Sequence, residues 1–258
     1  MPRRKTIQGE SARNSARSID KAEEARLRIL RAAIHEFSEH GLAGARTDAI
    51  AAAAKVNKAL LYYYFDSKEN LYVAALEMIS AKIRDRTLAV FLRECSPGER
   101  VLRSALEHFD RILTQHEFQG LMQQEMIRLH KGESSALEVL VKRIFAPAMT
   151  MYQSMVREGI ESGELIQADW MQIHLASLGA NVFYFLSAPV WRLLMSSEPF
   201  APEALAQRRT ALVEFLGQAI FTDRQRGADL AAQVLVDTPM PEVDPDRLMF
   251  GRNDERTK

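Results

Sequence analysis

Apolar residues recur every three or four positions along most of this chain, which is the spacing of a helix with one buried face. Leu27, Leu30, Ile34 and Phe37 show the pattern most clearly. No stretch of useful length alternates apolar and polar residues as a half-buried strand would. Gly and Pro are sparse inside the periodic segments, so the sequence predicts an all-α protein.

Capping signals near the N-terminus predict several short helices in succession. The predicted helix starts are Asp20 with Glu23 as a capping box, Thr47, Asn57 and Ser67. Gly41 suits the left-handed stop of the first of these helices. The helices that start at Thr47 and Asn57 must be short, because another start follows each of them closely.

Five longer helices are predicted downstream. Ser96, Pro97 and Glu99 open the first of them, which runs to about His116. The other four cover residues 117–131, 134–163, 169–195 and 202–221. We expect Pro147 to bend the second of these four and Pro189 to interrupt the third. From Thr222 onward the chain has no clear periodicity, and we expect an irregular tail over residues 222–258.

Composition places the chain among soluble globular proteins. It has 258 residues, of which 47% are apolar and 26% are charged. No apolar run has the length and purity of a membrane span, and the basic start is not followed by the apolar core of a secretory signal. The single cysteine, Cys95, excludes an internal disulfide framework. We therefore expect a cytoplasmic protein without a membrane partner.

Charge is neutral overall but uneven along the chain. Residues 1–68 hold thirteen Lys or Arg and eight Asp or Glu, a net of +5, and the remainder carries −5. Such an excess indicates an anionic partner for the N-terminal region or, alternatively, a solvated basic tail. Charge alone slightly favours the solvated tail.

The turn Lys55–Val56–Asn57 joins two short helices, and this arrangement predicts a helix-turn-helix. Ile50, Ala54, Val56 and Leu61 would face the first helix. Tyr62, Tyr63 and Tyr64 occupy three consecutive positions and so cannot share one buried face. The second short helix is therefore predicted to present aromatic side chains to a partner, with Leu61 and Phe65 as core residues.

These residues also resemble a known family. The segment "TDAIAAAAKVNKALLYYYFDSKENL" looks like the DNA-binding segment of the TetR-type transcriptional regulators, and "RILRAAIHEFSEHG" resembles the helix before it. The matching positions are Ala32, Ala33, Phe37, Gly41, Thr47, Ala54, Val56, Tyr62, Tyr64, Phe65, Lys68 and Leu71. Lys55 departs from the usual turn glycine, and Asn57 from the usual serine. The resemblance covers residues 26–75.

The resemblance implies a role for each exposed residue of this segment. Phosphate contacts would come from Arg46, Thr47, Tyr62, Tyr64 and Lys68, and base-edge contacts from Lys58, Ala59 and Tyr63. Lys55 would add a phosphate contact, and Asn57 would cap the recognition helix. An N-terminal arm, residues 1–19, is expected to be disordered. Its cations Arg3, Arg4, Lys5, Arg13 and Arg17 would either strengthen DNA binding or only aid solubility.

The resemblance further implies an N-terminal DNA-binding domain, residues 20–68, and a helical domain over residues 69–221 that binds a small molecule and forms a homodimer. Polar or soft groups on apolar helix faces supply the candidate ligand-binding residues: His108, Phe109, Met122, Glu125, Met126, Met149, Tyr152, His174, Asn181 and Tyr184. Each of them, taken alone, fits a packed core better than a ligand wall. As a set they favour a hydrophobic or aromatic ligand.

The expected function is therefore a ligand-responsive transcriptional regulator, most simply a repressor, that binds a pseudo-palindromic operator in double-stranded DNA. The resemblance leaves activation open. An enzyme or a small-molecule carrier with a vestigial motif is the alternative, and Lys55 is its only support in the sequence. His35 and His40 lie roughly 140° apart around a helix, so they do not form a zinc-protease pair. We predict no catalytic residue, metal or cofactor.

Overall fold

The structure, a computed structural model, describes residues 5–133, 136–195 and 198–243, with side chains from residue 20 onward. Helices make up most of these residues, with a single isolated bridge between Leu165 and Phe221. The all-α class is therefore confirmed. The chain divides into two compact units, which we describe separately. Unit 1 comprises Met1–Ser80 and Gly120–Ala136, and unit 2 comprises Ala81–Gln119 and Leu137–Lys258.

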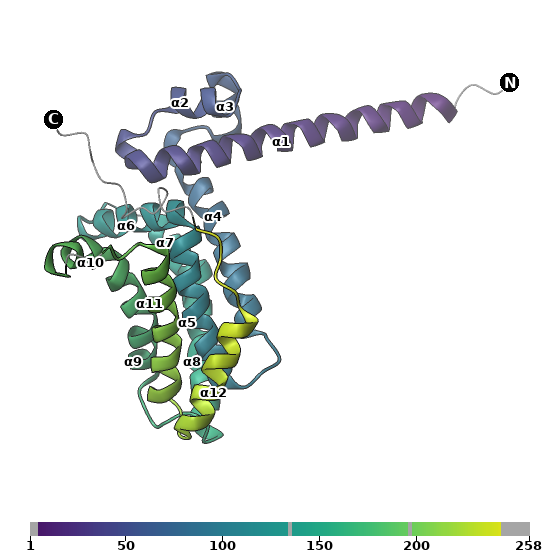
Figure 1. The fold of residues 1–258 in the computed structure, drawn as a ribbon. Coiled ribbons are helices and arrows are strands. Elements are labelled where there is room, and N and C mark those ends of the chain that lie inside the picture. The colour runs from purple at the N-terminus through teal and green to yellow at the C-terminus, as the bar shows by residue number, and fades with distance from the viewer. Residues whose placement is uncertain (1–4, 134–135, 196–197, 244–258) are drawn as a thin grey trace. The chain divides into compact units, whose positions relative to one another are not determined.

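Unit 1 contains the N-terminal helices of the chain (Figure 1). They are α1 (Lys5–Gly44), α2 (Thr47–Ala53), α3 (Lys58–Phe65), the first half of α4 (Lys68–Phe91) and most of α6 (His116–His130). Their core includes Phe37, Ile50 and Leu61, none of which is exposed to solvent. The ring of Phe37 meets that of buried Tyr72 edge to face, with centroids 4.9 Å apart.

Two local predictions for unit 1 need correction. Helix α1 begins at Lys5 rather than at Asp20, so residues 5–19 are helical and not a disordered arm. After Pro2 the arm has no further proline, and the Asp20 pattern lies inside a continuous helix. Thr47 is the first residue of α2 and does not cap it, because Arg46 occupies the capping position. Arg3 and Arg4 lie outside the described residues, as do the side chains of the other arm cations.

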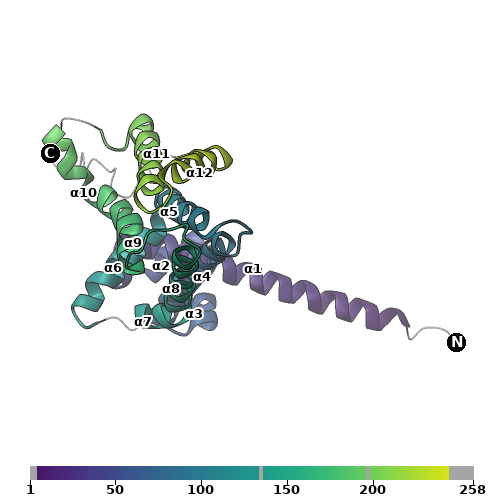
Figure 2. The same ribbon diagram turned by 90° about the horizontal axis from the view of Figure 1, so that it is seen from below.

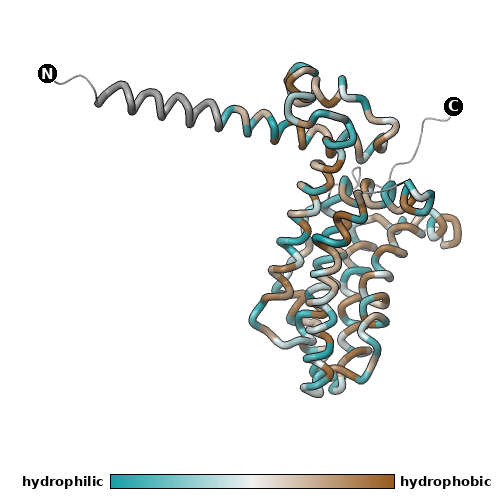
Figure 3. Tube along the Cα trace, turned by 180° about the vertical axis from the view of Figure 1, so that it is seen from behind, coloured by the Kyte–Doolittle hydropathy of each residue, from teal (hydrophilic) through white to brown (hydrophobic). Residues whose placement is uncertain are grey.

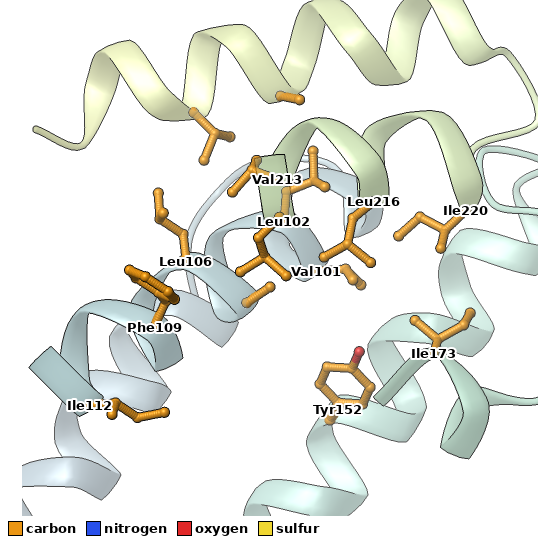
Figure 4. Packing of buried hydrophobic residues seen from close by; sticks show 14 of the residues in the cluster. Val101, Leu102, Leu106, Phe109, Ile112, Tyr152, Ile173, Val213, Leu216 and Ile220 are labelled. Carbon is orange, nitrogen blue, oxygen red and sulfur yellow. The ribbon is translucent and has the colours of Figure 1, made fainter. Parts of the chain in front are cut away.

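Unit 2 is a helical bundle. Its elements are the rest of α4, α5 (Pro97–Thr114), the short α7 (Ala136–Leu140), η1 (Val141–Phe145), α8 (Ala146–Glu161), α9 (Trp170–His174), η2 (Leu175–Gly179), α10 (Ala180–Met195), α11 (Pro202–Ala219) and α12 (Arg224–Asp237). Helices α5, α8, α11 and α12 run side by side (Figures 1 and 2). Their shared core includes Leu102, Phe109, Tyr152 and Leu216 (Figure 4).

The two prolines predicted to disturb helices of unit 2 differ in their surroundings. Just before Pro147 the helix widens into η1, a π-helical turn, because proline has no N–H to give to the usual carbonyl four residues back. Pro189, in contrast, lies inside α10 without ending it. The irregularity in that segment is η2, a second π-helical turn.

The predicted irregular tail is wrong for residues 224–237, which form α12. Asp223 caps this helix, and its buried stripe is made of Gly227, Ala231 and Val234. Small residues at helical spacing bury little area each, so the stripe is easily missed in the sequence. A Cβ placed on Gly217 would lie 2.5 Å from the carbonyl oxygen of Gly227, which shows how closely α11 and α12 pack. Residues 244–258 lie outside the described chain.

Candidate nucleic-acid interface and buried cavity

The turn between α2 and α3 has the predicted helix-turn-helix geometry. Lys55 adopts a φ of 56°. This is the left-handed conformation that glycine takes most easily. Asn57 then caps α3, because its Oδ1 accepts a hydrogen bond from the N–H of Leu60 at 2.7 Å. The predicted cap is confirmed, and Lys55 occupies a position that disfavours any residue with a Cβ.

Helix α3 divides into a buried and an exposed face. Leu61 and Phe65 are buried, as predicted. Tyr63 is 78% exposed and Tyr62 is 37% exposed, so neither ring belongs to the core. Tyr64 is half-buried, and its ring packs edge to face on Tyr63 with centroids 5.4 Å apart. The helix thus presents large aromatic side chains that its own unit does not cover.

Hydrogen-bonding groups lie around this exposed face. The hydroxyls of Thr47 and Tyr62 are 3.4 Å apart, but Thr47 is a buried residue, so Tyr62 is the more accessible of the two. Lys68 Nζ donates to the carbonyl of Ala43 at 3.2 Å, which holds the start of α4 near the end of α1. Ser67 caps α4, since its Oγ accepts from the N–H of Asn70. Hydroxyls, an ammonium and a helix N-terminus are groups that bind phosphate.

Lys58 has an acidic neighbour. Its Nζ lies 2.8 Å from Oδ1 of Asp48 on α2, and both side chains are exposed. The hydrogen bond between them lowers the pKa of Asp48 and raises the pKa of Lys58. Ala59, one residue further along α3, is exposed. Arg46 is also exposed, and its backbone N–H donates to Glu36.

Helix α6 braces the other helices of unit 1. The buried Tyr72 hydroxyl donates to Oε1 of Glu125 at 2.7 Å, and Glu125 is fully buried. The amide of Gln124 donates to the carbonyl of Ser38 at 3.2 Å. Arg128 lies over the ring of Tyr72 and 3.7 Å from Glu125. These contacts tie α6 to α1 and α4 within the unit.

Unit 2 contains a cavity of about 210 Å³. Helices α4, α5 and α8, the π-helical turn η1 and the α9–η2 segment all contribute to its wall, and Phe118 comes from the start of α6. The apolar lining residues are Ile83, Val90, Phe91, Phe118, Ile144, Phe145, Ala148, Met149 and Leu178. The polar ones are Arg84, Thr87, Ser104, Glu107, His108, Arg111, Tyr152 and His174. The polar residues expose little of their surface to the cavity, so the wall is still largely apolar, and its polar groups could orient a ligand.

Burial changes the ionisation of the polar lining. It lowers the pKa of His108 well below the usual range and also lowers the pKa of His174, so both imidazoles are neutral near pH 7. Burial raises the pKa of Tyr152 to about 12. The ring of Tyr152 meets that of His174 edge to face at 4.9 Å. His108 Nδ1 lies 3.4 Å from the amide nitrogen of Asn181, which donates to the Ala105 carbonyl at 3.0 Å.

Four of the ten predicted ligand-binding residues line this cavity: His108, Met149, Tyr152 and His174. The structure places the other six elsewhere. Phe109 is in the bundle core, and Tyr184 packs against that core. Asn181 contacts His108 through its amide nitrogen. Met122 and Glu125 are buried in unit 1, and Met126 is 63% exposed. Helical spacing identified apolar faces but not which neighbour each face meets.

Sequence reasoning missed the charged lining residues Glu107 and Arg111. They stand four apart on α5, on the same face as Ser104 and His108. Four polar residues on one face of a central helix could have indicated this site, because polar side chains are seldom buried unless they are paired or functional. In the part of the chain that the structure describes, no three His, Cys, Asp or Glu side chains gather as a metal site would require.

The fold and this site together define a class of protein, a helix-turn-helix DNA-binding unit joined to a helical unit with a cavity. Two family models match the chain. Residues 29–75 match the bacterial regulatory proteins of the tetR family, and residues 97–216 match the tetracyclin repressor-like C-terminal domain. The chain belongs to the TetR family of transcriptional regulators. Helix α12 lies beyond both matches.

Curated relatives include named repressors. The transcriptional repressor NicS of Pseudomonas putida is 28% identical over 65% of this chain and 77% of its own length. The repressor SCO4008 of Streptomyces coelicolor is 49% identical over 55 residues, which are 21% of this chain and 29% of that protein. The second likeness is thus confined to a short segment of both proteins.

Solved structures share the fold at lower identity. A putative transcriptional regulator from Saccharomonospora viridis in complex with choline has a TM-score of 0.60 and 18% identity, over 77% of this chain and 98% of that one. The ketosteroid regulator KstR2 of Mycobacterium tuberculosis has a TM-score of 0.56 and 20% identity, over 76% of this chain and 94% of that one. These likenesses establish the architecture.

Proposed function

We propose that this regulator is a homodimeric repressor that leaves a pseudo-palindromic operator when a small, largely apolar molecule occupies the cavity of unit 2. The observation that carries the proposal is the exposed face of α3, where Tyr62 and Tyr63 are open to solvent and the Tyr62 hydroxyl lies 3.4 Å from that of Thr47. A named repressor, NicS, is among the curated relatives, which favours repression over activation.

On DNA, Thr47, Tyr62, Tyr64 and Lys68 would contact phosphates, with Arg46 and Lys55 as further contacts. Lys58, Ala59 and Tyr63 would face base edges in the major groove. Asp48 adds a condition, because Lys58 pairs with it in the free protein. Lys58 has to exchange that carboxylate for a base acceptor, so Asp48 contributes to sequence discrimination by competing with weak acceptors.

The exposed apolar surface of unit 2 supports a homodimer. Helix α10, whose trace is coloured largely as hydrophobic in Figure 3, leaves a run of apolar side chains in solvent. They are Val182, Phe183, Leu186, Val190, Leu193, Leu194 and Met195. On the neighbouring α11, Phe215 is 66% exposed. Patches of this kind mark interaction sites, and a two-fold axis would place the same patch of a second copy against this one.

The same helix belongs to the segment Trp170–Met195, which is long and apolar enough to cross a membrane by length and composition, with 33% of the window buried. A second copy of the chain accounts for its exposed side chains without a membrane.

Phe183→Glu should therefore convert the dimer to monomer in sedimentation velocity. Val236→Glu, at an apolar side chain that is 83% exposed on α12, is the matched control and should leave the dimer intact. A monomeric wild-type protein would contradict the dimer.

DNA binding is tested by fluorescence anisotropy with an operator selected from genomic fragments by the purified protein. Lys68→Ala should weaken operator binding and reduce the slope of log affinity against log salt by roughly 1 for each phosphate interaction that is removed. Lys82→Ala removes an exposed lysine of the same helix in unit 2 and is the control. Equal affinities and salt slopes for the two variants would contradict the assignment of Lys68.

A further inference from the structure

The cavity of unit 2 contains a buried arginine that is incompletely paired. Arg111 is only 9% exposed, and its Nε has no hydrogen-bond partner. Its Nη1 lies 3.4 Å from the Thr87 hydroxyl and 3.8 Å from Oε2 of Glu107. Both contacts are long for hydrogen bonds. Burial lowers the pKa of the Arg111 guanidinium, as expected for a cation with little compensation.

Another buried arginine of the same bundle shows what full pairing looks like. Arg209 donates from Nε and Nη2 to the two carboxylate oxygens of Asp110 at 2.7 and 2.8 Å. It also donates to the carbonyl of Thr238 at 2.9 Å. This is the two-pronged geometry that a guanidinium forms with a carboxylate. Arg111 has the same donors and a similar degree of burial, but no carboxylate in that position.

Glu107 does not neutralise Arg111 by itself, because it serves two cations. Its Oε1 is 3.2 Å from Nε of Arg86, closer than its Oε2 is to Arg111. The group Arg86–Glu107–Arg111 therefore carries one net positive charge. The remaining lining cation, Arg84, lies 2.9 Å from Asp85, and its side chain is 45% exposed. His108 and His174 are neutral, so neither imidazole changes this net charge.

The rest of the cavity limits the size and chemistry of what could bring the missing anion. A cavity of about 150 Å³ in another protein accepts benzene. This one measures about 210 Å³. It therefore has room for one six-membered ring with a small substituent. Phe91, Phe118 and Phe145 supply apolar and aromatic wall for such a ring.

The wall also contains π-helical backbone, which is frequent at functional sites. Both π-helical turns of the described chain, η1 and η2, contribute to it through Ile144, Phe145 and Leu178. His174 lines the cavity immediately before η2.

We propose that the effector is a monocyclic aromatic carboxylate whose carboxylate pairs with the guanidinium of Arg111 while its ring packs among the phenylalanines. This inference names the ligand class for the cavity of the proposed repressor and rests on that proposal only for its regulatory meaning. Pairing with an uncompensated buried charge gives the ligand an interaction that a neutral molecule of equal shape does not have.

The test is a series of three ligands that share one shape and differ in charge: benzoate, benzamide and benzamidine. Isothermal titration calorimetry of each into the full-length protein should show benzoate binding at least tenfold more tightly than benzamide, with benzamidine the weakest. Tighter binding of benzamide or benzamidine would overturn the charge assignment. No binding of any of the three at millimolar concentration would overturn the ring-sized class.

Two variants locate the effect. Arg111→Gln should abolish the preference for benzoate over benzamide, whereas Glu107→Gln should tighten benzoate severalfold because it removes the competing carboxylate. Arg93→Gln, at an exposed arginine outside the cavity, is the control and should leave both affinities within about twofold. The benzoate affinity is compared with the benzamide affinity of the same variant, so a general loss of binding does not change the ratio. Circular dichroism confirms that each variant is folded. A benzoate preference that survives Arg111→Gln would refute the assignment, as would weaker benzoate binding by Glu107→Gln.

Operator binding, measured separately by anisotropy, keeps the two proposals apart. If the protein binds an operator but prefers benzamide, the ligand class fails and the repressor stands. If it binds benzoate through Arg111 but no genomic fragment at low salt, the ligand class stands and the proposed function fails.

Discussion

The hydrogen bond between Tyr72 and Glu125 gives the sharpest test of how unit 1 is held together. Tyr72→Phe removes only a hydroxyl and leaves the ring in place against Phe37. It also removes the hydroxyl that donates to Glu125 at 2.7 Å, and Glu125 is fully buried. A hydrogen bond to a charged acceptor contributes about 1.5–3 kcal/mol. We therefore expect Tyr72→Phe to lower the free energy of unfolding of unit 1 by about 2 kcal/mol.

Glu125→Met removes the acceptor of the Tyr72 hydroxyl and completes a double-mutant cycle with Tyr72→Phe. Stability is measured by urea denaturation followed by circular dichroism and by hydrogen exchange of α4 and α6 amides. The coupling between the two positions should be at least about 1 kcal/mol. Tyr64→Phe, at a half-buried ring, is the control and should change stability by less than about 0.5 kcal/mol. A loss below about 0.5 kcal/mol for Tyr72→Phe would refute the reasoning, as would zero coupling between the two positions.

Three further outcomes follow from positions described above. Lys55→Gly relieves the left-handed conformation of residue 55 but adds freedom to the unfolded chain. Unfolding by urea should therefore show a stabilisation of roughly 0–1 kcal/mol, and a loss above about 1 kcal/mol would contradict it. Because the folded pKa of His108 is depressed, the stability it contributes is present above the unfolded value of 6.5 and is lost as pH falls below it. The loss is at most about 1.4 kcal/mol per pH unit. His108→Gln should flatten that slope in denaturation between pH 7 and pH 5.5, and an unchanged slope would assign the loss to other groups. Arg209→Met leaves Asp110 buried without its partner. It should cost about 3–5 kcal/mol in thermal denaturation, whereas the double variant with Asp110→Leu should recover part of the loss.

The sequence predicted best what is decided within one turn of the chain. Asn57, Ser67 and Ser96 cap their helices as expected, because a cap needs only a side-chain oxygen and an N–H two or three residues on. The recognition helix was also predictable, since three consecutive tyrosines cannot be buried together. Both features depend on local geometry alone.

What the sequence did not predict depends on partners far along the chain. Met122 and Glu125 have the same helical spacing whether α6 faces a cavity or packs on α1 and α4, and only the fold decides between them. The sequence does not show that Arg111 is incompletely paired, because this follows from the position of Glu107 between two arginines. Helix α12 escaped notice because small residues such as Gly227 stabilise it through close approach rather than through large side chains.

The two π-helical turns have a consequence for how this regulator could diverge from its relatives. A π-helical turn holds one residue more than the α-helical turn it replaces, so it behaves as a tolerated single-residue insertion. Deletion of one residue within η1 or η2 would restore a regular helix and redraw the cavity wall at Phe145 or Leu178. The bundle core formed by α5, α11 and α12 takes no residues from either turn. Ligand preference can therefore change by insertion and deletion as well as by substitution, while the scaffold that stabilises the protein keeps its sequence.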